Sequence, residues 1–280
     1  MKIIPLLGNS QKLDGGAMFG NAPKALWQRW ARADELNRID LSCRSLLIEY
    51  ESKLILLEAG IGAFFDPAAK ERYGVVESEH VLLSSMQQHG ISHEDIDAVI
   101  LSHLHFDHAG GLFTPWQENV GPALLFPKAT FYVGKEQWQR ACNPHRRDRG
   151  SYIPQLQTLL QDSNRLVLIE RNDEPPFAAL LSFLWSDGHT PGLMMTCINT
   201  EEGPLVYASD LIPGSAWVNL SITMGYDRYP EMLIEEKTNL IEELYNDNGM
   251  IAFAHDPHMA VGKIVKNDMG KFAVEPIALS

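Results

Sequence analysis

The chain has 280 residues, of which 45% are hydrophobic, and a formal charge of −13 from 23 basic and 36 acidic residues. This length and composition suffice for a full hydrophobic core, so we expect a single domain over residues 1–280, with residues 1–40 as an N-terminal extension and candidate dimer contact. The acidic balance argues against nucleic acid as substrate or partner, and no apolar stretch approaches the length of a membrane span.

Cysteine content and the N-terminus point to one compartment. Three cysteines cannot all pair with one another, and none stands at the spacing of a metal-binding pair. The apolar run at residues 3–7 is broken by Pro5 and is shorter than the apolar region of a signal peptide. We therefore expect a cytoplasmic protein in a reducing compartment.

Hydrophobic periodicity predicts an alternation of strands and helices. In chain order we predict strands at 45–51 and 53–57, a helix at 79–88, a strand at 96–102, helices at 135–141 and 152–161, strands at 166–170, 180–186, 194–199 and 205–208, and a helix at 232–245. In the last helix Leu233 and Leu240 face inward, whereas Glu235 and Glu236 face outward. We expect His80, in the first helix, to be exposed.

The most informative motif follows the strand predicted at 96–102. His103-Leu104-His105-Phe106-Asp107-His108 places three imidazoles and a carboxylate within six residues, and Gly110 and Gly111 close the loop. Side chains at the carboxyl end of a strand can converge on a metal ion. Imidazole and carboxylate without thiolate suit zinc, manganese, iron or cobalt, and such sites are more often catalytic than structural.

Three further segments end in possible ligands. Asp187-Gly188-His189-Thr190-Pro191-Gly192 forms a turn, while Asp210 and His255 each follow a short apolar strand. For Asp187 two interpretations stay open, a hydrogen bond to a ligand imidazole or the cap of a turn. We expect Asp256, directly after His255, to lie in a solvated loop.

These motifs, in this order and spacing, resemble the metallo-β-lactamase superfamily over about residues 41–255. The resemblance implies an α/β fold, namely a four-layer αβ/βα sandwich of two mixed sheets with helices on the outer faces. It also implies two divalent metal ions, which we assign as zinc, with manganese, iron or cobalt as alternatives. The implied ligands are His103, His105 and His189 for the first ion, Asp107, His108 and His255 for the second, and Asp210 as the bridge.

The resemblance further implies a hydrolase in which a hydroxide bridges the two ions. Two cations lower the pKa of a shared water to about neutrality, and open coordination positions polarise a carbonyl or phosphoryl oxygen. We assign catalytic roles to Asp210, as the bridge, and to Asp107, which would pass a proton to the leaving group. Glu58-Ala59-Gly60 departs from the Asp-Thr-Gly that relatives carry at this place.

Within the superfamily, the strings at residues 13–20, 102–111 and 224–227 look like the branch of quorum-quenching lactonases and methyl parathion hydrolase. Asp210 stands where common zinc β-lactamases have Cys, and too few residues follow His255 for the helical domain of glyoxalase II. Acyl-homoserine lactonases carry a Tyr three residues after the bridging Asp, where this chain has Pro213. We expect a lactonase acting on a small ester-like molecule, as a homodimer, with an organophosphate phosphotriesterase as the alternative.

Two other classes stay open. An iron-dependent oxygen or redox enzyme uses a related scaffold, and a noncatalytic binding module would be expected to lose ligands, although none is lost here. Candidate residues of the substrate pocket are apolar or aromatic, as the acyl chain or aryl group of such a substrate requires. They are Met18, Phe19, Phe65, Trp217 and Tyr226.

Overall fold

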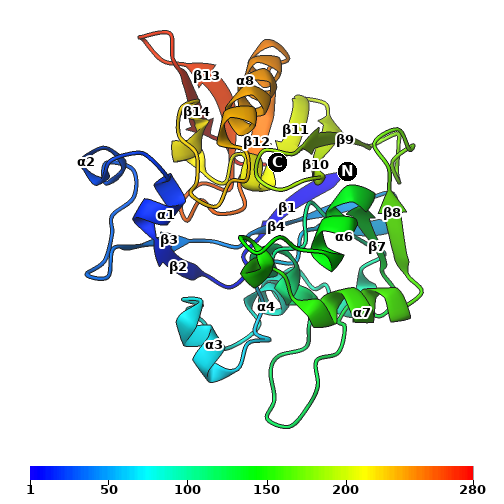
Figure 1. Ribbon diagram of the computed structural model, residues 1–280. Helices are drawn as coiled ribbons and strands as arrows, with labels where there is room; N and C mark the ends of the chain where they lie inside the picture. The colour runs from blue at the N-terminus through cyan, green and yellow to red at the C-terminus, as the bar shows by residue number, and fades with distance from the viewer. Residues whose placement is uncertain (280) are drawn as a thin grey trace. The chain divides into compact units, whose positions relative to one another are not determined.

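The computed structural model describes residues 1–279 and divides the chain into two compact units. Unit 1 comprises Met1–Lys12 and Ser42–Glu170, and unit 2 comprises Leu13–Leu41 and Arg171–Leu279. In Figure 1 the strands of the unit 1 sheet are coloured from blue to green, and those of the large unit 2 sheet from yellow-green to red. Each unit is therefore assembled from segments that are distant in sequence.

Unit 1 is built on a six-stranded mixed sheet with the order β1-β4-β5-β6-β7-β8. The strands are β1 (Lys2–Leu6), β4 (Ser45–Tyr50), β5 (Lys53–Leu57), β6 (Ala98–Leu101), β7 (Thr130–Gly134) and β8 (Leu166–Ile169). The first two pairs are antiparallel, and β5 through β8 run parallel. All four residues of β6 are buried, as is typical of a parallel strand covered on both faces.

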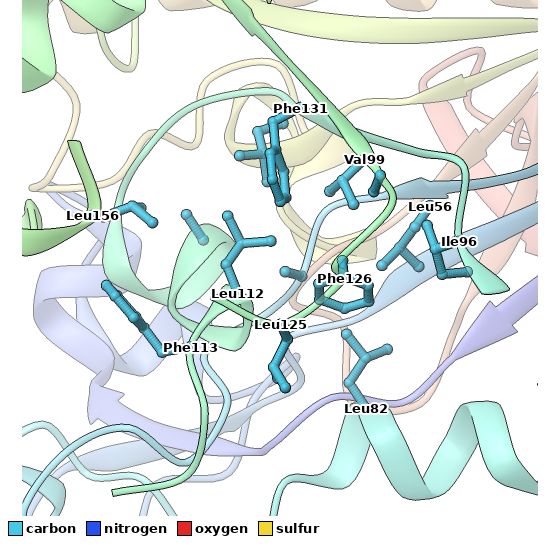
Figure 2. Packing of buried hydrophobic residues seen from close by; sticks show 14 of the residues in the cluster. Leu56, Leu82, Ile96, Val99, Leu112, Phe113, Leu125, Phe126, Phe131 and Leu156 are labelled. Atoms are coloured by element: carbon cyan, nitrogen blue, oxygen red, sulfur yellow. The ribbon is translucent and has the colours of Figure 1, made fainter. Parts of the chain in front are cut away.

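The helices of unit 1 accompany this sheet, and all but the first of them contribute side chains to its apolar core. They are α3 (Pro67–Arg72), α4 (Val81–Gln88), α5 (Phe106–Ala109), α6 (Lys135–Cys142) and α7 (Pro154–Asp162), with short 3-10 turns at His93–Asp95, Gly110–Leu112 and Arg149–Ser151. Figure 2 shows Leu82 of α4 pointing into the cluster that contains Leu56 and Phe126. Leu156 of α7 belongs to the same buried cluster. Burial of such side chains is the main favourable term in folding.

Unit 2 contains a second six-stranded mixed sheet with the order β14-β13-β12-β11-β10-β9. The strands are β9 (Leu181–Ser186), β10 (Leu193–Thr200), β11 (Gly203–Tyr207), β12 (Met250–Ala252), β13 (Val261–Lys266) and β14 (Phe272–Pro276). β11 and β12 are parallel, and the other pairs are antiparallel. A separate two-stranded sheet joins β2 (Gln11–Asp14) to β3 (Arg38–Leu41).

The longest helix of the described residues, α8 (Pro230–Asn246), packs on the unit 2 sheet. The shorter ones are α1 (Gly15–Phe19) and α2 (Lys24–Trp27), with 3-10 turns at Ser209–Leu211 and Ser215–Val218. The buried stripe of α8 contains Leu233, Leu240, Ile241 and Leu244, and also Lys237. Its inward face is therefore apolar as predicted, with one buried charge that the periodicity did not indicate.

The predicted α/β class with two mixed sheets is confirmed, and each predicted strand and helix is present with ends shifted by a few residues. The strands β1, β2, β3, β7, β13 and β14 were not predicted. Residues 1–40, predicted as an extension, are shared between the units, because β1 pairs with β4 in unit 1 and residues 13–41 belong to unit 2. Among residues 1–279, no helix is both long enough and apolar enough to cross a membrane.

Two glycine-containing turns of unit 1 touch through their backbones. Gly111 N donates to Gly60 O at 2.9 Å, and a Cβ on Gly111 would lie 1.9 Å from Ala59 O. Gly62 has a φ of +67°, and a Cβ there would lie 2.6 Å from Gly111 Cα. Only glycine permits this approach, which brings the chain after His108 against the end of β5.

We expect Gly111→Ala to lower the free energy of unfolding by about 3 kcal/mol or more, because the added methyl group meets a backbone oxygen that cannot rotate away. Urea denaturation measures the loss. Gly121→Ala is the matched control, since a Cβ at Gly121 meets no atom within 4 Å. Equal stability of the two variants would contradict the backbone contact.

Burial lowers the pKa of Lys237 to about 8, although the negative charge of Asp227 acts to raise it. Between pH 8 and the ordinary lysine pKa, the unfolded chain keeps a proton that the folded chain has lost, so stability rises with pH. We expect the free energy of unfolding to rise by up to about 3 kcal/mol over this interval. Lys237→Met, which lacks this titration, should show no such rise in parallel urea denaturations.

Candidate metal centre

The histidine loop, residues 102–108, leaves the carboxyl end of β6 in unit 1. β6 lies between the parallel strands β5 and β7, so the loop starts at a fixed point on the edge of the sheet. His103 and His108 are buried, as is most of His105. The backbone of His105 forms a β-bridge with Tyr152, whose ring centroid lies 4.9 Å from the imidazole. The predicted loop is therefore an ordered part of unit 1.

His103 and His105 turn ring nitrogens toward each other. His103 Nε2 lies 3.0 Å from His105 Nδ1, and His103 Nδ1 lies 2.9 Å from Ser102 Oγ. Two neutral imidazoles that face each other in a buried place need a shared proton or a shared cation. The hydroxyl of Ser102 fixes the plane of the His103 ring, which leaves Nε2 as its ligand atom.

Glu58 supports the histidine loop from the end of β5. Its Oε1 accepts a hydrogen bond of 2.8 Å from Ser102 N, and its Oε2 lies 3.6 Å from His108 Nδ1. The other ring nitrogen of His108 lies 3.9 Å from Asp107 Oδ2. Glu58 has a φ of +62° and is almost fully buried. The residue that departs from the pattern of relatives therefore holds the start of the loop through Ser102 N and places a carboxylate beside His108.

In unit 2, Asp227 holds the imidazole of His189. Asp227 Oδ1 lies 2.9 Å from His189 Nδ1, and Asp227 Oδ2 accepts a hydrogen bond of 2.6 Å from Met224 N. Both side chains are buried. A carboxylate on one ring nitrogen fixes the tautomer and raises the basicity of the other nitrogen, which is the usual arrangement for histidines that bind metals.

Asp210 and His255 follow the adjacent parallel strands β11 and β12 of unit 2. Because carboxyl ends of parallel strands meet at one edge, the two side chains converge: Asp210 Oδ1 lies 3.0 Å from His255 Nε2. The other oxygen, Oδ2, lies 3.1 Å from His189 Nε2. The Asp210 side chain thus presents each oxygen to a different imidazole, as a bridging carboxylate must.

These residues fit divalent cations. Within unit 1, His103, His105, Asp107 and His108 provide nitrogen and oxygen ligands, and within unit 2, His189, Asp210 and His255 do the same. None is a thiolate, the ligand set is almost entirely buried, and ring nitrogens of His103, His108 and His189 have polar partners that leave the second nitrogen for a metal. Zinc, manganese, iron and cobalt all suit such donors.

The loop that carries His189 is fixed by the carboxylate of Glu236 on α8. Glu236 Oε2 accepts hydrogen bonds from Ser186 Oγ at 2.6 Å and from Gly188 N at 3.1 Å, and Oε1 accepts one from Asp187 N at 2.8 Å. Gly188 has no room for a side chain, since a Cβ would lie 2.5 Å from Leu233 Cα. Helix α8 therefore acts as the support of the His189 turn.

Four expectations about polar residues are corrected or settled. Glu236 was predicted to face outward, but it faces the His189 turn. His80 is buried, with Nε2 3.0 Å from Gly111 O, rather than exposed.

Asp256 is buried rather than solvated. It accepts hydrogen bonds from Ser215, His258 and Met259, so it organises its loop. Asp187 caps its own turn through Gly192 N, while Asp227 takes the imidazole.

The candidate pocket residues lie in both units. In unit 2, Phe19 stacks between Trp27 and Trp217 at centroid distances of 5.4 and 4.5 Å, and Trp217 Nε1 donates to Met18 O at 3.1 Å. Phe19 and Trp217 line a cavity of about 380 Å³, within the size range of ligand pockets. Tyr226 is exposed. In unit 1, Phe65 lines a cavity of about 470 Å³. Their role in binding substrate remains a prediction.

Supporting residues around the ligands were mostly not predicted. Asp227 and Glu236 each hold a ligand residue or its loop, yet neither belongs to a recognisable motif with its partner, whereas Ser102 directly precedes the histidine that it contacts. Asp227 is 38 residues from His189 and Glu236 is 48 residues from Gly188. Such separations are set by tertiary structure, and a single sequence carries no signal for the pairing.

With this geometry established, comparison with known proteins identifies the family. Residues 38–255 match the family described as the metallo-beta-lactamase superfamily. This match covers most of the chain and includes all seven ligand-type residues. The protein belongs to the metallo-beta-lactamase superfamily.

Solved structures with the same fold include hydrolases. A probable metal-dependent hydrolase from Staphylococcus aureus is 29% identical, with a TM-score of 0.86, over 98% of this chain and 96% of that chain. The dizinc quorum-quenching lactonase AidC, solved with a product, is 22% identical, with a TM-score of 0.76, over 99% and 95% of the two chains. The hydrolase AbOPH is 19% identical, with a TM-score of 0.79, over 99% and 94%.

We expect Asp227→Asn to weaken the binding of zinc by about 10- to 100-fold, because the amide removes the charge that supports the His189 imidazole. Competition with a chromogenic chelator measures the dissociation constant. Asp187→Asn is the control, since Asp187 caps the same turn without touching the ring, and its zinc affinity should stay near that of the wild type. Equal losses in both variants would show that only the turn matters.

We expect Glu236→Gln to lower the free energy of unfolding by about 2–4 kcal/mol, because three donors lose a charged acceptor. Glu235→Gln changes the exposed neighbouring residue and should leave stability unchanged within about 0.5 kcal/mol. Urea denaturation of both proteins compares them. A Glu236→Gln protein as stable as the control would contradict the role of α8 as the support of the turn.

Proposed function

We propose that the protein is a metal-dependent hydrolase that opens small lactones. The observation that carries the proposal is the complete ligand set, in which His103, His108 and His189 each have a partner on the ring nitrogen away from the expected metal. A noncatalytic relative would have no reason to keep these buried, oriented imidazoles. The lactonase AidC, of the same fold, supports the choice of lactones as the first substrates to test.

In this proposal the seven residues hold two divalent cations, with the ligand assignments that the sequence implied. When bound, such cations lower the pKa of a coordinated water and polarise the substrate's carbonyl oxygen. Asp210 offers one oxygen to the side of His189 and the other to the side of His255. Asp107, the more exposed of the two acidic ligands, would take the proton of the attacking water and pass it to the ring oxygen as its bond to the carbonyl carbon breaks, which gives the product alcohol.

Pro213 favours phosphotriesters as a second class of substrate. Acyl-homoserine lactonases use a Tyr at this place, and Pro213 instead accepts a hydrogen bond of 2.8 Å from His255 N through its carbonyl oxygen. This backbone contact supports the His255 turn, and the proline ring has no hydroxyl group to offer a substrate. Tyr226, which is exposed, is the phenol of unit 2 that we propose to assist in its place. The cytoplasmic location and the homodimer remain predictions.

Proton release by the zinc-loaded protein with a long-chain acyl-homoserine lactone tests the proposal. We expect turnover at about 1 per second or faster, with loss of activity in His103→Ala and full activity in His89→Ala, which changes an exposed histidine. Activity on phosphotriesters alone would favour the second class. Metal analysis runs in parallel, because one iron per chain would instead indicate oxygen or redox chemistry.

A further inference from the structure

Lys237 occupies a position that an apolar residue should fill. It lies in the buried stripe of α8 with Leu233, Leu240 and Ile241, and its exposed fraction is 0%. A buried ammonium group costs several kcal/mol unless hydrogen bonds and a counter-charge offset the loss of water. Lys237 therefore needs a partner that offsets the cost of its burial.

That partner is the backbone of a segment formed by residues 219–227. Lys237 Nζ donates to Ile222 O at 2.5 Å and to Asn219 O at 3.1 Å. The side chains of Ile222 and Met224 pack into the same apolar cluster as the stripe of α8. Lys237 thus fixes a loop from inside the core.

The 219–227 segment consists of two successive turns. Ile222 N donates to Asn219 O at 3.1 Å in the first turn, and Asp227 N donates to Met224 O at 3.2 Å in the second. Lys237 binds both ends of the first turn. The second turn is closed by the Asp227 carboxylate, which accepts from Met224 N with one oxygen and faces His189 Nδ1 with the other.

Lys237 and Asp227 also interact through their opposite charges. Burial lowers the pKa of Lys237, and the negative charge of Asp227 opposes that shift. Asp227 is itself buried, with an exposed fraction of 2%. Two opposite charges therefore act on each other within the core of unit 2, one holding the first turn and the other closing the second.

We propose that Lys237 is a positioning residue for the metal centre: by holding the carbonyls of Asn219 and Ile222, it fixes the segment that presents Asp227 to His189. The inference rests on the proposed role of His189 as a ligand. Lys237 takes no part in the chemistry, because its amine is sealed in the core. It acts through Asp227, and its effect is to fix the orientation of the His189 imidazole.

Lys237→Met removes the donors while keeping an unbranched side chain that is one atom shorter. In metal-free protein, we expect the amides of Met224, Asp227 and Arg228 to exchange with deuterium about tenfold faster or more, while amides of β13 stay unchanged. We expect zinc affinity to fall by about tenfold, at the lower end of the range for residues that support ligating histidines. Neither readout needs hydrolysis, so each decides the inference even if no lactone is cleaved.

Leu240→Val is the matched control, because it weakens the same buried face of α8 and leaves both hydrogen bonds of Lys237 in place. It should lose stability but keep the zinc affinity and the exchange rates of the wild type. If Lys237→Met behaves like this control, Lys237 contributes stability alone and the inference is overturned. If Lys237→Met does not fold, Lys237→Gln carries the same test, with smaller changes expected in both readouts and no change overturning the inference.

The double variant Lys237→Met with Asp227→Asn tests the route. If Lys237 acts through Asp227, the two losses in zinc affinity should be clearly less than additive, because the second substitution removes a contact that the first has already loosened. Additive losses would show that Lys237 reaches the metal centre by some other path, and would overturn the assignment.

Discussion

A histidine can bind a metal ion in a defined direction only if its second ring nitrogen is already committed, and this constraint organises much of what surrounds the ligands. Ser102 and Asp227 each engage one nitrogen of a buried imidazole at 2.9 Å, and the Glu58 carboxylate lies 3.6 Å from a nitrogen of a third. These partners are in turn held by main-chain groups, as Glu58 is by Ser102 N and Asp227 by Met224 N. The orientation of each ring is therefore fixed before any ion arrives, which reduces the reorganisation that binding requires.

Placement of the ligands comes from the sheets and from close backbone packing. In unit 2, Asp210 and His255 converge because β11 and β12 are parallel neighbours. In unit 1, the chain after the histidine loop can return to β5 only because Gly111 has no side chain to collide with Ala59 O. Strand direction sets which residues can meet, and glycine sets how tightly the loops behind them can pack.

The sequence predicted the ligands and most of the regular elements, because both depend on local patterns. Burial of β6 and the His103–His108 motif are visible in six or seven consecutive residues. The supporting residues are different in kind: Glu236 reads as an outward helix position, and Lys237 as a polar interruption of an apolar stripe. Their partners lie in loops far along the chain, so their roles depend on tertiary contacts that periodicity does not encode. Lys237 did leave one local signal, a lysine at an inward helical position.

The first forty residues show how a segment can be structural in two places at once. In unit 1, β1 forms the edge strand beside β4, so its removal would expose the hydrogen-bonding groups of an inner strand. In unit 2, Phe19 fills the space between Trp27 and Trp217. A shortened chain that began after this region would expose the unpaired backbone groups of β4 and would leave Trp217 without the aromatic ring that stacks on it. Such a truncated chain should therefore aggregate rather than form a smaller stable protein.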